Sequence, residues 1–116
     1  MAINYSLAKI KKGKRQVWED WCRKLMTDHY EEGVFSLTEE DLVRERCFIF
    51  GKGDDSYVLY QHQTVVGKKK KPFNPDRKLN QEHFAKLLEC LESIDGGVVI
   101  NGYDFIVIGD YDFQVK

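Results

Sequence analysis

The pattern of apolar and polar positions in residues 44–66 predicts a β-hairpin at the middle of the chain. Two runs rich in β-forming residues, 44–50 and 56–66, flank the turn-forming segment Gly-Lys-Gly-Asp-Asp at 51–55. Residues 47–50 are Cys-Phe-Ile-Phe, four apolar residues in succession. Because successive side chains of a strand point to opposite faces, this run places apolar groups on both faces of the sheet.

The remaining pattern predicts two helices and further strands. Residues 3–10 alternate like a strand, and a basic turn follows at 11–14. A first helix carries the apolar stripe Val17, Trp18, Trp21, Cys22 and Leu25. A second helix carries the stripe Phe84, Leu87, Leu88, Leu91 and Ile94, and we expect Asn80 to cap it and Gly96-Gly97 to end it. Asn101-Gly102 then predicts a terminal hairpin within residues 98–108.

The end of the first helix has two interpretations. Gly33 either ends the helix as a C-terminal cap or only interrupts it. Thr38, followed by three acidic residues, resembles the start of a new helix. We expect a long helix, a kink or short break, and a brief second helical piece that reaches about Leu42.

The element order β-α-β-β-α-β predicts a single α+β domain spanning residues 1–116. Its economical form is a four-stranded antiparallel sheet with two helices on one face. Phe48 and Phe50 lie on the face opposite Cys47 and Ile49, and two helices cover only one face, so one of the two sets is left on an open apolar face. We therefore predict a homodimer that packs through the open sheet face. The alternative is a monomer whose loops or tail cover that face.

Composition restricts the environment and the partners of the protein. An aromatic content of 13% and an apolar content of 42% argue against disorder, and a net charge of −1 gives no general attraction to nucleic acid or anionic membranes. No signal-peptide pattern and no membrane-spanning run are apparent, and the three cysteines lack a paired CxxC spacing. We predict a reduced, cytoplasmic protein with no membrane association.

The chain resembles the dimeric α/β-barrel proteins, a superfamily of ferredoxin-like fold that includes the antibiotic-biosynthesis monooxygenases. The resemblance begins with Lys-Ile-Lys-Lys-Gly-Lys at 9–14 and the aromatics Trp18 and Trp21. Within that superfamily the chain is similar to a small uncharacterised bacterial family. The residues that suggest it are Thr38-Glu39-Glu40, Glu45, Tyr57-Val58-Leu59-Tyr60, Glu82-His83 and Glu89-Cys90-Leu91-Glu92. The resemblance implies the fold and the dimer more firmly than an activity.

Six residues are candidates for a ligand pocket between the sheet and the helices: Asn4, Trp18, Trp21, Tyr60, His62 and His83. Tyr60 and His62 share a strand face, where a neutral histidine could exchange protons and Glu45 or Arg46 could contribute. The simpler interpretation makes residues 61–64 the solvated end of the strand. For His83 the simpler interpretation is an exposed or capping side chain at a helix start.

The resemblance also implies a haem alternative. In haem-degrading relatives a histidine of the second helix binds the iron, which corresponds to His83, and an asparagine of the first strand corresponds to Asn4. Those relatives also use a tryptophan near the third strand, whereas Trp18 and Trp21 both lie on the first predicted helix. We therefore predict no cofactor and no metal, with catalytic residues unassigned.

Three functions follow from these observations. The first is a cytoplasmic homodimer that binds a small apolar or aromatic ligand between sheet and helices without catalysis. The alternative is a cofactor-independent or haem-linked enzyme of the monooxygenase type. The third is a nucleic-acid or protein interaction module that uses Lys68, Lys69, Lys70 and Lys71, although a solvated loop explains this basic run more simply.

Overall fold

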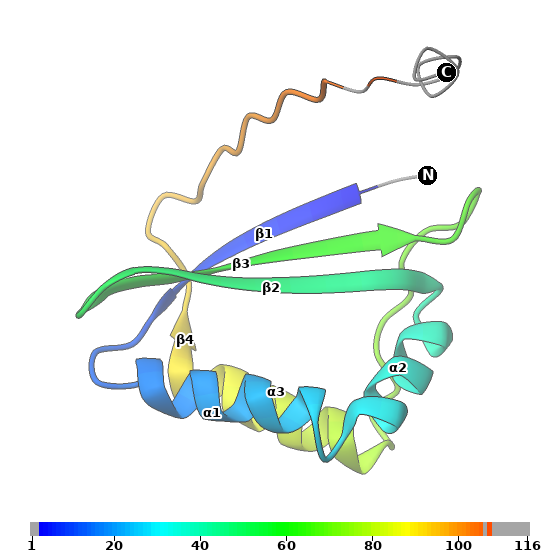
Figure 1. Cartoon of the computed structure of the whole chain (residues 1–116), viewed down its shortest axis with the longest axis horizontal. Coiled ribbons are helices and arrows are strands. Elements are labelled where there is room, and N and C mark those ends of the chain that lie inside the picture. Colours follow the sequence, from blue (N-terminus) through cyan, green and yellow to red (C-terminus); the bar gives the residue numbers. More distant parts are fainter. Residues whose placement is uncertain (1–2, 106, 108–116) are drawn as a thin grey trace, which may run out of the picture.

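The protein is an antiparallel sheet with its helices gathered on one side. A computed structural model describes residues 3–105 and 107. Its elements are β1 (Ile3–Ile10), α1 (Arg15–Met26), α2 (Tyr30–Glu39), β2 (Leu42–Lys52), β3 (Asp55–Thr64), α3 (Lys78–Cys90) and β4 (Leu91–Glu92). The strand order is β2-β3-β1-β4. Figure 1 shows α1 and α3 side by side beneath the sheet, with α2 at one end of that layer. The predicted α+β class and antiparallel sheet are confirmed.

The strand register gives the sheet two different apolar faces. Cys47 and Ile49 of β2 lie opposite Tyr60 and Val58 of β3, and this face packs on the helices. Fully buried core residues there include Ile10 and Trp18. The other face carries large apolar side chains that remain 44–49% exposed: Ile3, Tyr5, Phe48 and Phe50. The predicted open apolar face therefore exists in the chain.

The central hairpin forms where the sequence predicts it. Lys52 pairs with Asp55 at its end, and Gly51 has a φ of 97°. A Cβ at Gly51 would collide with the carbonyl oxygen of Asp55, so this position requires glycine. Arg15 fixes the turn to α1, because its Nη1 donates to the Gly51 carbonyl at 2.8 Å and to Ser56 Oγ at 3.0 Å.

The helical break differs from the prediction in both position and cause. α1 ends at Met26, and Thr27 caps it through a backbone N–H that donates to the Lys24 carbonyl. The Thr27 hydroxyl also donates to the Arg23 carbonyl at 3.0 Å, which competes with continuation of the helix. Gly33 lies inside α2 and does not end a helix. Thr38 lies in the last turn of α2, so the expected helix start at this residue was wrong.

The buried face of α3 also differs from the predicted stripe. Phe84 and Leu88 are 47% and 61% exposed, whereas Leu79 and Cys90 are buried. A stripe through 79, 83, 87 and 90 fits the helical period as well as one through 84, 87, 88 and 91, and packing against α1 selects the first. The helix begins at Lys78, so Asn80 is not its cap. Asn80 instead donates to the Asn74 carbonyl at 3.1 Å.

The expected terminal hairpin is absent from the described residues. β4 is only Leu91–Glu92, directly after α3, and it pairs with Lys9 and Ile10 of β1. Gly96 and Gly97 then adopt φ values of 77° and 73°, which turns the chain away from the sheet. Residues 98–105 form no strand, and positions 106 and 108 of the expected hairpin lie outside the described residues. Asn101-Gly102 has the right turn chemistry, but the residues described on either side of it do not pair.

Candidate functional site

Two strands bring a polar group pair to the helix-facing side of the sheet. Tyr60 and His62 lie two residues apart on β3 and stack with ring centroids 5.7 Å apart and planes 7° apart. His62 Nε2 lies 2.7 Å from Glu45 Oε1 of the neighbouring strand. The pairing explains how Glu45 is accommodated in the sheet. His62 is therefore the cross-strand partner of Glu45.

The helices cover this strand face with two tryptophans and a histidine. Trp21 Nε1 donates a hydrogen bond to His83 Nδ1 at 2.9 Å, which joins α1 to α3. Trp18 lies beneath, fully buried, with its ring 6.0 Å from His83 and 6.4 Å from Tyr60. We call Trp18, Trp21, Tyr60, His62 and His83 the His83 cluster.

His83 connects the helices to the sheet as a neutral imidazole. Because its Nδ1 accepts a hydrogen bond from the Trp21 indole N–H, the neutral ring carries its own proton on Nε2. That nitrogen lies 3.5 Å from the Tyr60 hydroxyl, a long contact that a small shift would shorten. Burial lowers the pKa of His83, and the charge of Glu45 opposes this only in part. The arrangement can therefore donate and accept hydrogen bonds at pH 7 without carrying charge.

Two thiols adjoin the cluster. The hydrogen bond between Cys22 and Cys47 raises the pKa of Cys22 and lowers the pKa of Cys47. Burial is the main cause that raises the pKa of Tyr60 well above its ordinary value. A negative charge formed here would therefore reside on Cys47. Sequence reasoning missed this pair, and its one available signal was the alternation that places Cys47 on the face of Ile49.

The indole N–H of Trp18 is a buried donor without a hydrogen bond in the described part of the chain. It acts on the Cys47 sulfur, whose pKa it helps to lower, but the two groups do not meet hydrogen-bond geometry. Thiol sulfur is in any case a weak acceptor. A buried N–H that lacks a hydrogen-bond acceptor in the protein can be satisfied by an acceptor atom of a small molecule.

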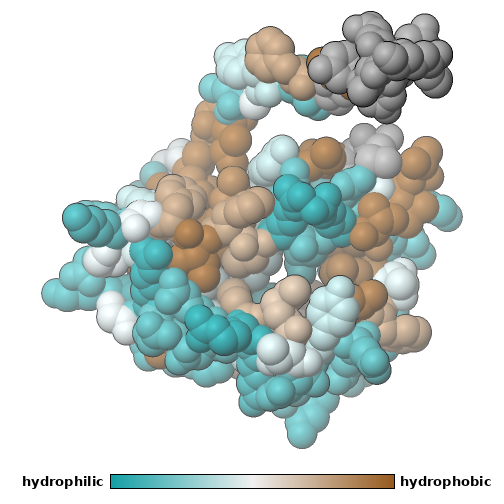
Figure 2. Space-filling view, viewed as in Figure 1, coloured by the Kyte–Doolittle hydropathy of each residue, from teal (hydrophilic) through white to brown (hydrophobic). Residues whose placement is uncertain are grey.

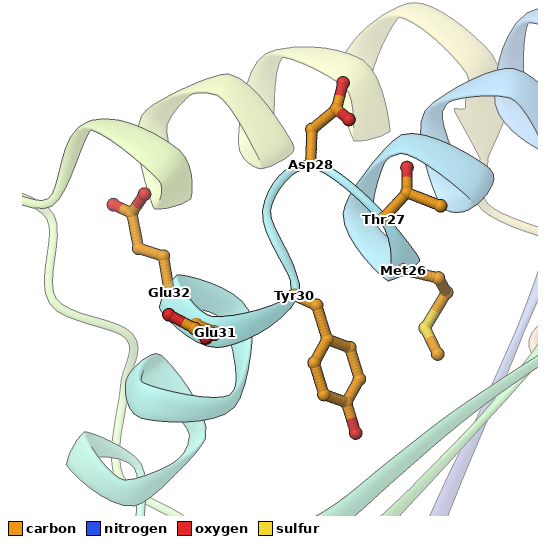
Figure 3. Close-up of a pocket in the computed structure, with 6 residues that line it drawn as sticks. All are labelled: Met26, Thr27, Asp28, Tyr30, Glu31 and Glu32. Carbon is orange, nitrogen blue, oxygen red and sulfur yellow. The ribbon is translucent and has the colours of Figure 1, made fainter.

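A surface cavity lies at the connection between α1 and α2. This cavity of about 560 Å³ is lined by Met26, Thr27, Asp28, Tyr30, Glu31 and Glu32. Figure 3 shows Met26 and Tyr30 pointing toward the sheet, whereas Asp28 points away from it. Met26 and Tyr30 are 65% and 50% exposed, and the six lining residues include no residue of the sheet or of the His83 cluster.

A second hollow reaches Trp21 from the outer side of the helices. It has a volume of about 660 Å³ and lies between α1 and α3, lined by Val17, Asp20, Trp21, Lys24, Glu82, Ala85, Lys86 and Glu89. Trp21, which is only 5% exposed, forms part of the wall of this hollow and donates its hydrogen bond to His83. The sequence predicted neither hollow.

Five of the six residues predicted for a ligand pocket are in mutual contact. They are the members of the His83 cluster, which ring contacts and hydrogen bonds connect. Asn4 pairs with His62 in the strand register and shares its helix-facing side. His83 is half-buried and its Nδ1 accepts a hydrogen bond from Trp21, so the simpler interpretation of an exposed or capping side chain was wrong. The role of these residues in ligand binding stays a prediction.

The basic loop is partly neutralised by acidic groups of the α2–β2 connection. Lys70 Nζ lies 2.9 Å from Glu40, and Lys71 Nζ lies 3.1 Å from Asp41. The backbone N–H of Lys71 also donates to the Glu40 carbonyl at 2.9 Å. These contacts fix the loop to the body of the protein and occupy two of its four lysines.

Comparison with protein families now identifies the chain. The model of a family described as "Family of unknown function (DUF6176)" matches residues 1–100. The chain belongs to DUF6176. The DUF6176 match includes every residue of the His83 cluster and Asn4. No curated protein and no solved structure matches this DUF6176 chain. In the described part of the chain, no helix is both long enough and apolar enough to cross a bilayer.

Proposed function

We propose that this DUF6176 protein is a homodimer that binds a small aromatic or apolar ligand between its sheet and its helices, without catalysing a reaction. The observation that carries the proposal is the convergence of Trp18, Trp21, Tyr60, His62 and His83 between helices and sheet, with Trp21 forming part of the wall of the hollow between α1 and α3. Binding sites for small molecules combine apolar and aromatic walls with a few placed polar groups. The His83 cluster has this composition.

The chemistry of the cluster selects a class of ligand. Indole and phenol rings favour a flat aromatic molecule that stacks edge-to-face or offset. The buried Trp18 N–H and the neutral His83–Tyr60 pair favour a ligand with one uncharged hydrogen-bonding group, such as a hydroxyl or carbonyl. A charged ligand would lose its hydration without finding a compensating charge in the cluster.

We extend the proposal to the fold family and the cellular location. The central position of β1 and β3 between edge strands β2 and β4 supports a ferredoxin-like fold of the dimeric α/β-barrel kind. The additional helix α2 and the two-residue β4 depart from that pattern. The open apolar face supports packing against a second copy. A cytoplasmic location is part of the same proposal and is consistent with three free cysteines.

Tryptophan fluorescence tests the ligand proposal directly, because the chain contains only two tryptophans and both belong to the His83 cluster. The probe is 4-nitrobenzyl alcohol, a small neutral aromatic alcohol with a quenching nitro group. We expect saturable quenching in the unmodified protein. Loss of one hydrogen bond in His83→Gln should weaken half-saturation about fivefold to tenfold.

Phe84→Leu provides the matched control. Phe84 is the next residue of α3, but its side chain is 47% exposed on the outer side of the helix. This variant should keep the binding curve of the unmodified protein. Linear, unsaturated quenching that is equal in all three proteins would refute a site at the His83 cluster.

The haem-linked alternative has less support from the geometry. Both ring nitrogens of His83 face other side chains, since Nδ1 accepts from Trp21 and Nε2 lies beside Tyr60. Coordination of iron would require one of these contacts to break. We expect a titration with haem to leave the Soret band without a saturable change. A saturable shift that disappears in His83→Ala would instead favour the haem-linked enzyme.

A further inference from the structure

The first strand has a backbone edge that the chain leaves largely unpaired. β1 pairs with β3 along Ile3–Lys9, but on its other side β4 covers only Lys9 and Ile10. Residues 3–8 therefore have no strand partner on that side within the described residues. Their sequence, Ile-Asn-Tyr-Ser-Leu-Ala, contains no charge and no proline to discourage strand addition.

A second unpaired segment follows β4. Residues 98–105, which we call the arm, have β-branched and aromatic side chains and form no strand with any described part of the chain. Val99, Tyr103 and Phe105 are 85%, 84% and 94% exposed. Figure 1 shows the arm leaving the body on the side of the sheet opposite the helices, and Figure 2 shows apolar surface where it leaves. Exposure of this kind is characteristic of a segment that another surface covers.

The two unpaired segments match in length and in chemistry. At about 3.3 Å per residue, the eight-residue arm spans roughly 26 Å and the free edge of β1 roughly 20 Å. The arm carries no charge before Asp104, and the edge carries none. Main-chain hydrogen bonds between the arm and the β1 edge would pair the free backbone N–H and C=O groups of both segments.

The path of the chain directs the arm away from its own β1. The Gly97 N–H donates to the Ile94 carbonyl at 3.0 Å and closes a turn directly after β4. With Gly96 and Gly97 at positive φ, this turn ends the short ladder at Glu92 instead of continuing it along β1. A second copy related by a two-fold axis can accept the arm and return its own.

We propose that the arm of each copy adds as a strand to the free β1 edge of a second copy. This inference rests on the homodimer of the proposed function and specifies how the two copies are joined. The added strand would also lie next to the open apolar face of the sheet, because Ile3 and Tyr5 of β1 belong both to the free backbone edge and to that face. The reciprocal exchange buries the arm's apolar side chains and leaves neither edge unpaired.

A proline in the arm tests the exchange in the full-length chain. Val99→Pro removes a backbone donor and restricts the preceding residue, which weakens an added strand. The buried core is made by residues outside the arm, so the domain should still fold. The matched control is Lys69→Pro in the exposed basic loop. Light scattering gives the mass, and hydrogen exchange followed by mass spectrometry gives the protection of amides 3–8.

We expect a dimer in the unmodified protein and in Lys69→Pro, with slow exchange in residues 3–8. Val99→Pro should weaken dimerisation at least about tenfold and speed that exchange. Equal mass and equal hydrogen exchange in the two variants would overturn the proposed exchange of arms but leave the sheet-face dimer standing. If the unmodified protein is a monomer and its amides 3–8 lose their hydrogen-exchange protection in Val99→Pro, the arm folds on its own chain. That result also overturns the proposed exchange of arms. If the unmodified protein is a monomer with fast hydrogen exchange in residues 3–8, both the proposed exchange of arms and the dimer are overturned.

Discussion

At the scale of single residues, His83 is the group whose environment has the clearest functional consequence. It is half-buried against two tryptophans, and its Nδ1 accepts a hydrogen bond from one of them, which favours a neutral ring. A neutral imidazole can present a donor or an acceptor to an uncharged ligand. The same burial makes the protein sensitive to acid.

The pKa of His83 predicts how stability depends on pH. Burial lowers this pKa below 6.5, so the folded protein keeps the ring neutral while the unfolded chain takes up a proton. The stabilisation is complete above pH 6.5 and declines as pH falls from 6.5 toward the lower folded pKa. The limiting slope is about 1.4 kcal/mol per pH unit.

Urea unfolding between about pH 7.5 and about pH 5.5 measures this effect. The free energy of unfolding should fall less steeply with acid in His83→Gln than in the unmodified protein. Glu82→Gln changes the preceding residue of α3 and leaves the imidazole in place, so this variant should keep the full slope. Equal slopes in all three proteins would contradict the neutral, half-buried state of His83.

A second prediction concerns the hydrogen bond between Trp21 and His83. Trp21→Phe keeps an aromatic ring but leaves Nδ1 of the half-buried His83 without its donor, which should lower the free energy of unfolding by about 1–3 kcal/mol. The control is Trp21→Phe combined with His83→Leu, where no acceptor remains to be satisfied. Urea unfolding should show that His83→Leu costs less in the protein that already carries Trp21→Phe than in the unmodified protein. Strict additivity of the two changes would contradict a direct coupling.

The sequence predicted the members of the site better than their arrangement. Alternation along β3 placed Tyr60 and His62 on one face, and helical spacing placed Trp18 and Trp21 on one stripe. His83 was harder, because a histidine beside an apolar stripe is equally consistent with an exposed position. Only the packing of α3 on α1 brings it beneath Trp21. The contact between α1 and β2 through their two thiols joins different layers, so local patterns could not show it.

At the scale of elements, the central hairpin is determined by backbone geometry at one glycine. Gly51→Ala combines a φ of 97° with a collision between the new Cβ and the Asp55 carbonyl, and should destabilise the protein by about 2–3 kcal/mol. Gly53→Ala should cost only about 1 kcal/mol, because its φ is 57° and its Cβ would meet open space. Urea midpoints compare the two. Equal losses would contradict this account of the turn.

The element-level predictions succeeded where a local signal was sufficient. The hairpin turn, the first strand and the two apolar helices follow from turn chemistry and periodicity. The predicted terminal hairpin does not form among the described residues, because a strand needs a partner as well as a turn and the chain turns away from β1 after Glu92. The predicted position of the helix break was wrong because Thr27, rather than Gly33, makes the hydrogen bonds that compete with continuation of α1.

At the scale of the whole molecule, the open sheet face is the feature that a single chain does not explain. Arg46 lies over the Phe48 ring at 5.9 Å, and Phe50 stacks on Tyr57 at 5.6 Å, so this face is organised rather than loose. The apolar part of this face runs from Phe48 and Phe50 of β2 through Tyr57 and Leu59 of β3 to Leu7 of β1. Tyr5 and Ile3 extend it along β1, where Gln61 and Gln63 lie beside them. The homodimer proposal follows from this surface.

Phe48→Ser should weaken the dimer by at least about tenfold, because it removes a large apolar group from the proposed interface. Phe84→Ser is the matched control, since Phe84 is equally exposed but lies on α3, on the other side of the molecule. Sedimentation velocity over a range of concentrations gives both dissociation constants. Equal weakening in the two variants would remove the sheet face from the interface.

The mass of the unmodified chain in solution tests the central claim most directly. Light scattering at micromolar concentration should give about twice the 13.6 kDa chain mass. A mass of 13.6 kDa under the same conditions would contradict the homodimer, and with it the proposal that a second copy covers the open face of the sheet.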